Sequence, residues 1–327
     1  MPQRPLEYIY PGIVAAQAIH AAVQFRIPDL LATGPKTAVE LASECGAHAP
    51  TLDRLLRALT SLDMFRQTPD RRYANTPLTE ILRTDQTQSL SAVARFLPAP
   101  YLWAAMGGLP ESVRTGEPAF NRAFGQSFFD YLASHPQEAA AFNQVMTLEI
   151  AWISPAILRA YDFSRFKTLV DVGGGQGAFM RDILVATPAL RGILFDQPQV
   201  VADAEKILSG EIAKRATIAA GSFFDHVPEG GDAYILKRII HDWMDDDAAK
   251  ILRNVRRAIT PGGTLLLIDA LVDSQTHPAG LADLMMLVLG GCERTEAQFR
   301  ALLKSAGFSL TRIVPAGAYS LIEGQPV

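Results

Sequence analysis

The stretch DVGGGQGA, from Asp171 to Ala178, decides the fold of this chain. It overlaps the end of an apolar segment, 168–172, that is typical of a buried strand, and a helical pattern starts near Ala178. Glycines let the backbone turn sharply and bring amide N–H groups close to a ligand at the start of a helix. The stretch therefore predicts a site for a nucleotide-like cofactor. It does not say which one, because Gly173, Gly175 and Ala178 also satisfy the dinucleotide pattern GxGxxG/A.

From this stretch onward, strand patterns alternate with helical patterns. Strands are expected at 168–172, 191–196, 216–220, 232–236, 263–269, 308–315 and 318–323. Helices are expected at 178–187, 199–209, 245–259 and 295–306. Only a tight turn, Pro315 to Gly317, separates the last two strands, so the final strand should run antiparallel to its neighbour. The expected fold class is α/β, with a Rossmann-like, mainly parallel seven-stranded sheet covered by helices on both faces.

Residues 1–95 are expected to form a separate helical domain. A helical pattern that Pro28 should close is followed by two more, joined by a turn around Gly46, and then by the polar stretch RQTPDRRYANTP. Helix, turn, helix and a hairpin-like wing form a winged-helix pattern. Ten Lys and Arg residues against nine Asp and Glu residues lack the basic excess of a DNA-reading domain. A dimerisation domain is therefore expected, and DNA binding is kept as an alternative.

The other two segments are assigned to a substrate pocket and to catalysis. Residues 96–165 are rich in aromatic residues and methionine, side chains that pack between domains and also line pockets for flat apolar ligands. They are expected to form a helical linker that contributes to a substrate pocket. Residues 166–327 are expected to form the cofactor-binding catalytic domain.

The composition argues against several broad classes of protein. With 49% hydrophobic and 20% charged residues and a net charge of −4, the chain resembles an ordinary globular protein without general attraction to nucleic acid or anionic membranes. The start, MPQRPLEY, lacks the features of a signal peptide, and no apolar run reaches the roughly 20 residues of a membrane span. Cys45 and Cys292 lie far apart without a CxxC pattern, which favours a reducing compartment. A cytoplasmic protein is expected.

Three features favour S-adenosylmethionine over a nicotinamide dinucleotide as the cofactor. An acid, Asp171, stands two residues before the first glycine. The segment GSFFD, Gly221 to Asp225, falls at the end of the third strand, where an adenine ring would lie. The closing antiparallel strand pair departs from an all-parallel dinucleotide fold. Asp196, at the end of the second strand, suits the ribose hydroxyls of either cofactor.

Together these motifs resemble those of the plant-type small-molecule O-methyltransferases and of their bacterial relatives that act on natural products. The resemblance covers nearly the whole chain and rests on LVDVGGGQGAF, LFDQPQV, GSFFD, LKRIIHDW, ITPGG and DLMMLVLGGCERTEAQFRALLKSAGF. HDW followed some fifty residues later by GG-x-ERT is its most specific part. It implies S-adenosylmethionine as cofactor and a homodimer formed through the N-terminal domain.

The resemblance also implies the cofactor contacts. The expected cofactor-binding residues are Asp171, Gly173, Gly175, Asp196, Ser222, Phe223 and Lys237. Gly173 should face the methionine part, Asp196 the ribose, and Lys237 the carboxylate. Ser222 and Phe223 should flank the adenine. Many relatives have Asp in place of Ser222, and a neutral contact is weaker than a charge-assisted one.

The stretch KRIIHDWMDDD, Lys237 to Asp247, supplies a candidate base on the same carboxyl edge of the sheet. A phenol with a pKa near 10 is mostly protonated at neutral pH, whereas an imidazole with a pKa of about 6.5 is suited to accept its proton. His241 is therefore the candidate general base. By the resemblance, Glu293 in GGCERT and Asp269 after LLLI hold its other ring nitrogen. Asp269 is one methylene shorter than the Glu of many relatives, so Glu293 is the stronger candidate.

The run of acids beside His241 is interpreted as the start of a helix. Asp242, Asp245, Asp246 and Asp247 resemble a metal cluster, but no second set of ligands appears at a suitable spacing. Acids at a helix N-terminus favour the helix dipole, and a helix is expected to begin near Asp245. No metal is therefore expected.

By the same resemblance, the acceptor pocket is lined by Phe142, Met146, Met285 and Met286, with Asp283 as a polar contact. Such walls suit a small aromatic or polyketide-like molecule with a hydroxyl group. The expected activity is methylation of that hydroxyl. Two alternatives stay open: non-methylating chemistry on the same fold, such as hydroxylation or rearrangement, and a ligand-responsive winged-helix DNA regulator.

Overall fold

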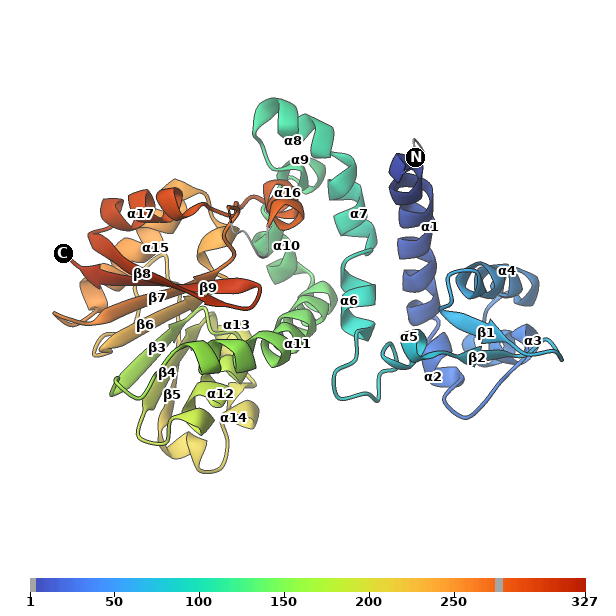
Figure 1. The fold of residues 1–327 in the computed structure, drawn as a ribbon, viewed down its shortest axis with the longest axis horizontal. Helices are drawn as coiled ribbons and strands as arrows, with labels where there is room; N and C mark the ends of the chain where they lie inside the picture. The colour runs from blue at the N-terminus through green and yellow to red at the C-terminus, as the bar shows by residue number, and fades with distance from the viewer. Residues whose placement is uncertain (1–3, 274–278) are drawn as a thin grey trace. The chain divides into compact units, whose positions relative to one another are not determined.

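The computed structural model of this protein describes residues 4–273 and 279–327. The chain forms two compact units (Figure 1). One comprises Met1–Ala104 and His135–Leu148, and the other comprises Ala105–Ser134 and Glu149–Val327. The chain passes from the first unit to the second twice, within α7 (Pro100–Gly107) and within α11 (Pro136–Ala160).

The first unit contains short helices and a small hairpin around one apolar core. Its helices are α1 (Arg4–Gln24), α2 (Ile27–Leu30), α3 (Ala38–Cys45), α4 (Ala49–Thr60), α5 (Pro77–Glu80), α6 (Ser91–Phe96) and the first part of α7 (Pro100–Gly107). The wing of the winged-helix pattern is the antiparallel pair β1 (Phe65–Gln67) and β2 (Tyr73–Asn75). Leu41, Leu56 and Tyr73 are fully buried in the core.

The prediction that Pro28 closes the first helix is wrong. Helix α1 ends at Gln24, and Arg26 then adopts a left-handed φ of 55°. Pro28 lies in the first turn of α2 instead. A proline is well tolerated there because its missing N–H group would have no partner in the first turn. The turn at Gly46 is confirmed, since this residue ends α3 with a φ of 70°.

The second unit is built on a seven-stranded sheet, as predicted. The strands are β3 (Thr168–Val172), β4 (Arg191–Asp196), β5 (Ala216–Ala220), β6 (Ala233–Lys237), β7 (Thr264–Asp269), β8 (Phe308–Ala316) and β9 (Tyr319–Pro326). They lie in the order β5-β4-β3-β6-β7-β9-β8. All pairs are parallel except β7 with β9 and β8 with β9. The last strand therefore inserts between β7 and β8, antiparallel to both.

Alternating side chains of the strands supply two cores, one on each face of the sheet. In β7, Leu265 and Leu267 belong to one core, and Leu266 and Ile268 belong to the other. This alternation follows from the two-residue period of a strand. Helices α15 and α17 cover the first face, and α12, α14 and the end of α11 cover the second. The sheet is therefore buried on both sides, which leaves its edges and strand ends for a site.

The helices of the second unit are α8 (Leu109–Thr115), α9 (Ala119–Phe124), α10 (Phe128–Ser134), α12 (Ala178–Ala186), α13 (Pro198–Val201), α14 (Ala204–Ile207), α15 (Asp245–Ala258), α16 (Gly280–Leu289) and α17 (Glu296–Ser305), with short 3-10 turns η1 (Ile212–Lys214) and η2 (Ile240–Asp242). The helix expected at 199–209 is two short helices. Helix α16 has no counterpart among the helices expected from periodicity, because its sequence is apolar on all sides. No helix in the described part of the chain is long and apolar enough to cross a bilayer.

Candidate active site

The carboxyl ends of four neighbouring strands bring the expected residues to one edge of the sheet. Asp196 ends β4, Lys237 ends β6 and Asp269 ends β7, while Asp171 lies one residue before the end of β3. These strands are adjacent in the order β4-β3-β6-β7. Open α/β sheets bind their ligands along this edge, so the topology gathers these expected site residues where a ligand would bind.

The glycine turn after β3 forms a tight cradle that side chains would fill. Gly173 and Gly175 have φ values of 71° and 62°, a region that strains other residues. A Cβ atom on Gly173 would lie 2.4 Å from Cδ1 of Ile239, after β6, and one on Gly174 would lie 2.5 Å from Cδ1 of Leu194, in β4. The turn is therefore held close to both neighbouring strands, with its backbone amides at the start of α12.

Asp196 is fixed against this turn by backbone hydrogen bonds. The amide of Gly175 donates to its Oδ2 at 2.8 Å, and the amide of Gln197 donates to its Oδ1 at 2.7 Å. Burial raises the pKa of Asp196, and these two amides oppose that shift. Its carboxylate is thus held beside the cradle, where a ribose diol would meet it.

The GSFFD segment, Gly221 to Asp225, is held by a buried side chain that the sequence analysis did not single out. Nδ2 of Asn254, on α15, donates to the carbonyl of Phe223 at 2.7 Å. Ser222 Oγ accepts the amide of Phe224 at 3.2 Å. The rings of Phe223 and Phe224 both meet Trp243 edge-on, with centroids 6.0 and 4.7 Å away. Trp243 of the HDW motif therefore packs against the GSFFD segment.

Asp171 and Lys237 are buried charges beside the cradle. Neither carboxylate oxygen of Asp171 has a hydrogen-bond partner within the described residues. Burial raises its pKa to about 7, although the charge of Lys237 acts in the opposite direction. Burial also lowers the pKa of Lys237, against the attraction of Glu149 and Asp171. An unpaired buried carboxyl group at this position fits a site that a polar ligand completes.

His241 and Glu293 form a buried pair, as the resemblance implied. Nδ1 of His241 lies 2.9 Å from Oε1 of Glu293, and both side chains are almost fully buried. The contact depends on Gly291, whose added Cβ would lie 2.1 Å from the backbone oxygen of His241. The same oxygen accepts the amide of Cys292 at 2.8 Å. The glycines of GGCERT thus let this segment reach the backbone of the histidine.

Arg294 clamps the same histidine segment from the other side. Its buried guanidinium donates to the carbonyl of Ile240 at 2.9 Å and to that of Trp243 at 2.7 Å. It also donates to Oδ1 of Asp245 at 2.8 Å. Asp245 begins α15, as the helix interpretation of the acidic run predicted. Sequence reasoning missed this clamp, because an arginine gives no sign of which carbonyls it will meet.

Two other acids near the imidazole, Asp269 and Asp242, do not make the hydrogen bond to Nδ1 of His241 that is expected of a supporting carboxylate. Both oxygens of Asp269 are buried without a hydrogen-bond partner in the part of the chain that the structure describes. Burial raises its pKa to about 7, against the charge of His241. Asp242, which the sequence grouped with the helix acids, instead places Oδ1 3.3 Å from Nε2 of His241. Burial also raises the pKa of Asp242.

The expected acceptor residues fall into both units. Met285, Met286 and Asp283 lie on α16 in the second unit, where Oδ1 of Asp283 accepts the amide of Glu293 at 2.8 Å. Asp283 therefore helps to hold the supporting acid. Phe142 and Met146 lie in the first unit, and the Phe142 ring packs 5.7 Å from that of Phe96.

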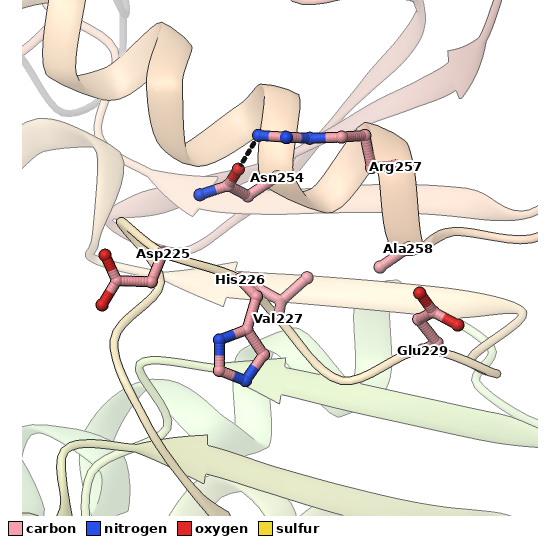
Figure 2. Close-up of a pocket in the computed structure, with 7 residues that line it drawn as sticks. All are labelled: Asp225, His226, Val227, Glu229, Asn254, Arg257 and Ala258. Carbon is pink, nitrogen blue, oxygen red and sulfur yellow. Dashed lines mark hydrogen bonds between the residues drawn. The ribbon is translucent and has the colours of Figure 1, made fainter.

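A surface hollow lies between the end of the GSFFD segment and helix α15. Figure 2 shows its lining residues, which are Asp225, His226, Val227, Glu229, Asn254, Arg257 and Ala258. Arg257 donates to the amide oxygen of Asn254, the bond drawn in the figure. None of the residues expected to bind cofactor or acceptor lines this hollow.

The sheet order, the glycine cradle and the buried histidine–glutamate pair together define a methyltransferase that uses S-adenosylmethionine. Comparison with known proteins agrees. Residues 106–309 match the O-methyltransferase domain, and residues 8–85 match the O-methyltransferase dimerisation domain. The chain belongs to this O-methyltransferase family and is an S-adenosylmethionine-dependent O-methyltransferase.

Similar proteins come from bacterial natural-product pathways. The mitomycin biosynthesis 6-O-methyltransferase of Streptomyces lavendulae is 41% identical, over 95% of this chain and 90% of that protein. The phenazine O-methyltransferase PhzM of Lysobacter antibioticus is 38% identical, over 97% of this chain and 94% of that one. The solved O-methyltransferase NcsB1 of neocarzinostatin biosynthesis, in complex with S-adenosylmethionine and 2-hydroxy-5-methyl naphthoic acid, has a TM-score of 0.85 and 33% identity, covering 96% of each chain. These relatives give no support to a non-methylating enzyme or a DNA regulator.

Proposed function

We propose that this enzyme methylates a hydroxyl group of a small aromatic or polyketide-like molecule, with His241 as general base and Glu293 as its support. The observation that carries the proposal is the 2.9 Å contact between Nδ1 of His241 and Oε1 of Glu293 at the cofactor edge of the sheet. A carboxylate at Nδ1 favours the tautomer whose proton lies on that nitrogen. Nε2, which Oδ1 of Asp242 approaches at 3.3 Å, is then the nitrogen that accepts a proton from an acceptor.

The cradle residues fit S-adenosylmethionine. In the proposed arrangement Gly173 faces the methionine part, and the amide of Gly175 holds Asp196 in place. Asp196 accepts from the ribose hydroxyls, and Lys237 meets the carboxylate. Ser222 and Phe223 flank the adenine, and Asp171, whose oxygens lack partners among the described residues, supports the same end. When bound, the cofactor supplies an electrophilic methyl group on a sulfonium.

His241 acts at the hydroxyl of the acceptor. Nε2 of His241 would take the hydroxyl proton of the acceptor as the acceptor oxygen receives the methyl group that the bound cofactor would supply. Glu293 stabilises the imidazolium that results. Asp269 is proposed as a second support that acts through the field rather than through a hydrogen bond. Positioning of acceptor and base should supply much of the rate.

The acceptor class follows from the side chains near the base and from the relatives. Met285 and Met286 on α16 offer apolar, adaptable surface. Phe142 and Met146 stay acceptor contacts predicted from the resemblance alone. Asp283 would give the acceptor a polar contact through its Oδ2, because its Oδ1 accepts the amide of Glu293. NcsB1 was solved with a hydroxylated naphthoic acid, which is a flat molecule of the same kind.

A homodimer is proposed through the N-terminal domain. The match of residues 8–85 to a dimerisation domain supports it, and so do four exposed apolar residues of α1: Ile9, Tyr10, Ile13 and Val14. Such a stripe marks an interaction surface. Sedimentation equilibrium should give twice the mass of the chain, and a monomer at micromolar concentration would contradict the proposal.

Both cysteines are free, so we also propose that the enzyme works in the cytoplasm.

The first test is the substitution His241→Gln. The variant should bind S-adenosylmethionine normally in titration calorimetry and lose at least about a hundredfold in kcat, the lower range for general-base catalysis. Turnover is measured with labelled cofactor and a panel of phenols. His48→Gln, at an exposed position in the first unit, is the matched control and should keep full activity. Unchanged turnover in His241→Gln would remove the base assignment.

A further inference from the structure

Arg238 stands out by its backbone as well as by its surroundings. It follows Lys237 at the end of β6, and its φ is 56°, in the left-handed region that few residues other than glycine adopt. Its amide donates to the carbonyl of Ile268 at 2.9 Å, which ties it to β7. Strained backbone of this kind persists only where surrounding contacts fix it, and such positions gather at functional sites. Contacts around Arg238 therefore have to fix its backbone.

The guanidinium of Arg238 lies between the carboxylate of Glu149, which is partly buried, and that of Glu293, which is buried. Its Nε is 3.5 Å from Oε1 of Glu149, and its Nη1 is 3.6 Å from Oε1 of Glu293. Its Cζ lies 5.2 Å from the ring centroid of Tyr319, whose hydroxyl donates to Glu149. These partners come from α11, from the segment after α16, and from β9. Arg238, Glu149 and Tyr319, all partly buried, therefore form a frame around one end of Glu293.

One oxygen of Glu293 joins this frame to the base. Oε1 is the atom that Nδ1 of His241 approaches at 2.9 Å, and it is also the atom nearest Nη1 of Arg238. The other oxygen, Oε2, is buried without a hydrogen-bond partner among the described residues. Arg238 therefore has two effects on the pair. It fixes the carboxylate in space, and its positive charge opposes protonation of the imidazole.

We propose that Arg238 is a positioning residue that holds Glu293 in register with His241 and keeps the imidazole in the neutral, proton-accepting form. The inference rests on the proposed role of His241 as general base. Glu149 and Tyr319 act one step further out, because they hold the guanidinium. No part of the proposal requires Arg238 to touch cofactor or acceptor.

Charge around the imidazole supports this role. The charged groups that act on it are Asp242 of η2, Arg238 after β6, Asp269 of β7, Glu293 after α16 and Glu149 of α11. Burial lowers the pKa of His241, but Asp242, Glu293 and Asp269 raise it above its ordinary value overall. Arg238 is the nearby cation that counters them. Without it, more of the enzyme would carry a protonated, inactive imidazole at neutral pH.

The test compares Arg238→Gln with Arg238→Lys. In Arg238→Gln, kcat on the pH plateau should fall by about tenfold, as for other residues that orient a functional histidine. The acid limb of the kcat/KM profile should move to higher pH by about one unit, because a nearby positive charge has been lost. Arg238→Lys keeps the positive charge but lacks the planar guanidinium with its several N–H donors. Its acid limb should therefore lie close to that of the wild type, whereas its kcat should be only partly restored. The dissociation constant for S-adenosylmethionine should change less than about threefold in both.

A matched control exists elsewhere in the same unit. Arg312 lies 3.0 Å from the buried Glu323, and its Cζ lies 5.2 Å from the ring of Tyr161. Arg312→Gln removes the same kind of arginine–glutamate–tyrosine contact away from the site. It should lower the melting temperature without moving the acid limb.

Other results would refute either the role of Arg238 or the role of His241 on which it depends. An acid limb that stays in place in Arg238→Gln would refute it, and so would a defect confined to cofactor affinity. If Arg238→Gln fails to fold, an unmoved plateau kcat in Arg238→Lys would refute the positioning role. If His241→Gln keeps its turnover, the proposed base itself is wrong, whatever the arginine variants do.

Discussion

The cofactor cradle and the base cluster lie on the same sheet edge but are built in opposite ways. The cradle is made mainly of backbone: positive φ values at Gly173 and Gly175, and amides that meet the carboxylate of Asp196. The base cluster is made of buried side chains that come together from distant parts of the sequence. His241 and Glu293 are separated by 52 residues, and Arg238 meets Glu149 from a helix 89 positions earlier (238 − 149).

The difference shows how each region resists substitution. A backbone cradle is disturbed only by residues that change its local conformation, so its defects should appear in cofactor binding. A cluster of buried charges is balanced by all its members, so one change alters the geometry and protonation of the rest. Its defects should appear in turnover and in pH dependence. Three substitutions test this contrast, beginning with the largest expected effect.

Gly291→Ala should disable the base cluster without touching the cradle. Its Cβ would lie 2.1 Å from the backbone oxygen of His241, and backbone cannot move aside cheaply. The segment carrying Glu293 must then withdraw, and a misplacement of about 1 Å can lower turnover by about a hundredfold. Cofactor affinity should stay near that of the wild type in titration calorimetry. Gly280→Ala, on α16 where a Cβ meets nothing, is the control and should be fully active.

Gly173→Ala should weaken the cradle and spare the base. The residue has a φ of 71°, and an added Cβ would lie 2.4 Å from Cδ1 of Ile239. The strain of a left-handed alanine, about 1–3 kcal/mol, corresponds to a dissociation constant for S-adenosylmethionine raised by about tenfold or more. At saturating cofactor, kcat should recover. Gly210→Ala carries similar strain away from the site, with a φ of 64°, and should leave the affinity unchanged. A kcat defect that saturation does not remedy would contradict the separation of the two regions.

Asp269→Asn should have the smallest effect, and it should appear in stability. Burial raises the pKa of Asp269 from 3.8 to about 7 in the folded protein. Between these values the unfolded chain is ionised while the folded chain keeps its proton, so this group makes the protein less stable as pH rises. Asn does not ionise. The melting temperature of the variant should therefore gain on the wild type between pH 5 and pH 8, by about 2–4 °C for each kcal/mol recovered. A difference that stays constant with pH would show that Asp269 is ionised in the folded protein.

The contrast also explains what the sequence could and could not predict. The strands were predicted to within about three residues, because buried parallel strands are short apolar runs between turn signals. The cradle was recognisable because its chemistry is local: glycines, a preceding strand and a following helix. The pairing of His241 with Glu293 came only from the resemblance to a family, since no periodicity links positions so far apart.

Other features carried no usable signal. Arg238 stands beside Lys237 and reads as one of two adjacent cations, and nothing local shows that Glu149 or Tyr319 will meet it. Arg294 makes its contacts with carbonyl groups, which every residue possesses. Pro28 was misread because proline both ends helices and begins them, and only the left-handed turn at Arg26 decides between the two.

The place of β9 in the sheet has a consequence for biosynthesis. This strand is the last of the seven to leave the ribosome, yet it lies inside the sheet, between β7 and β8. Asp269 pairs with Ser320, next to Tyr319 of the arginine frame. A nascent chain that stops before β9 leaves β7 as an open edge and lacks the tyrosine that anchors Glu149. Catalytic competence is therefore acquired only after β9 has been synthesised, and truncations that remove β9 should be inactive even when every glycine and histidine motif is present.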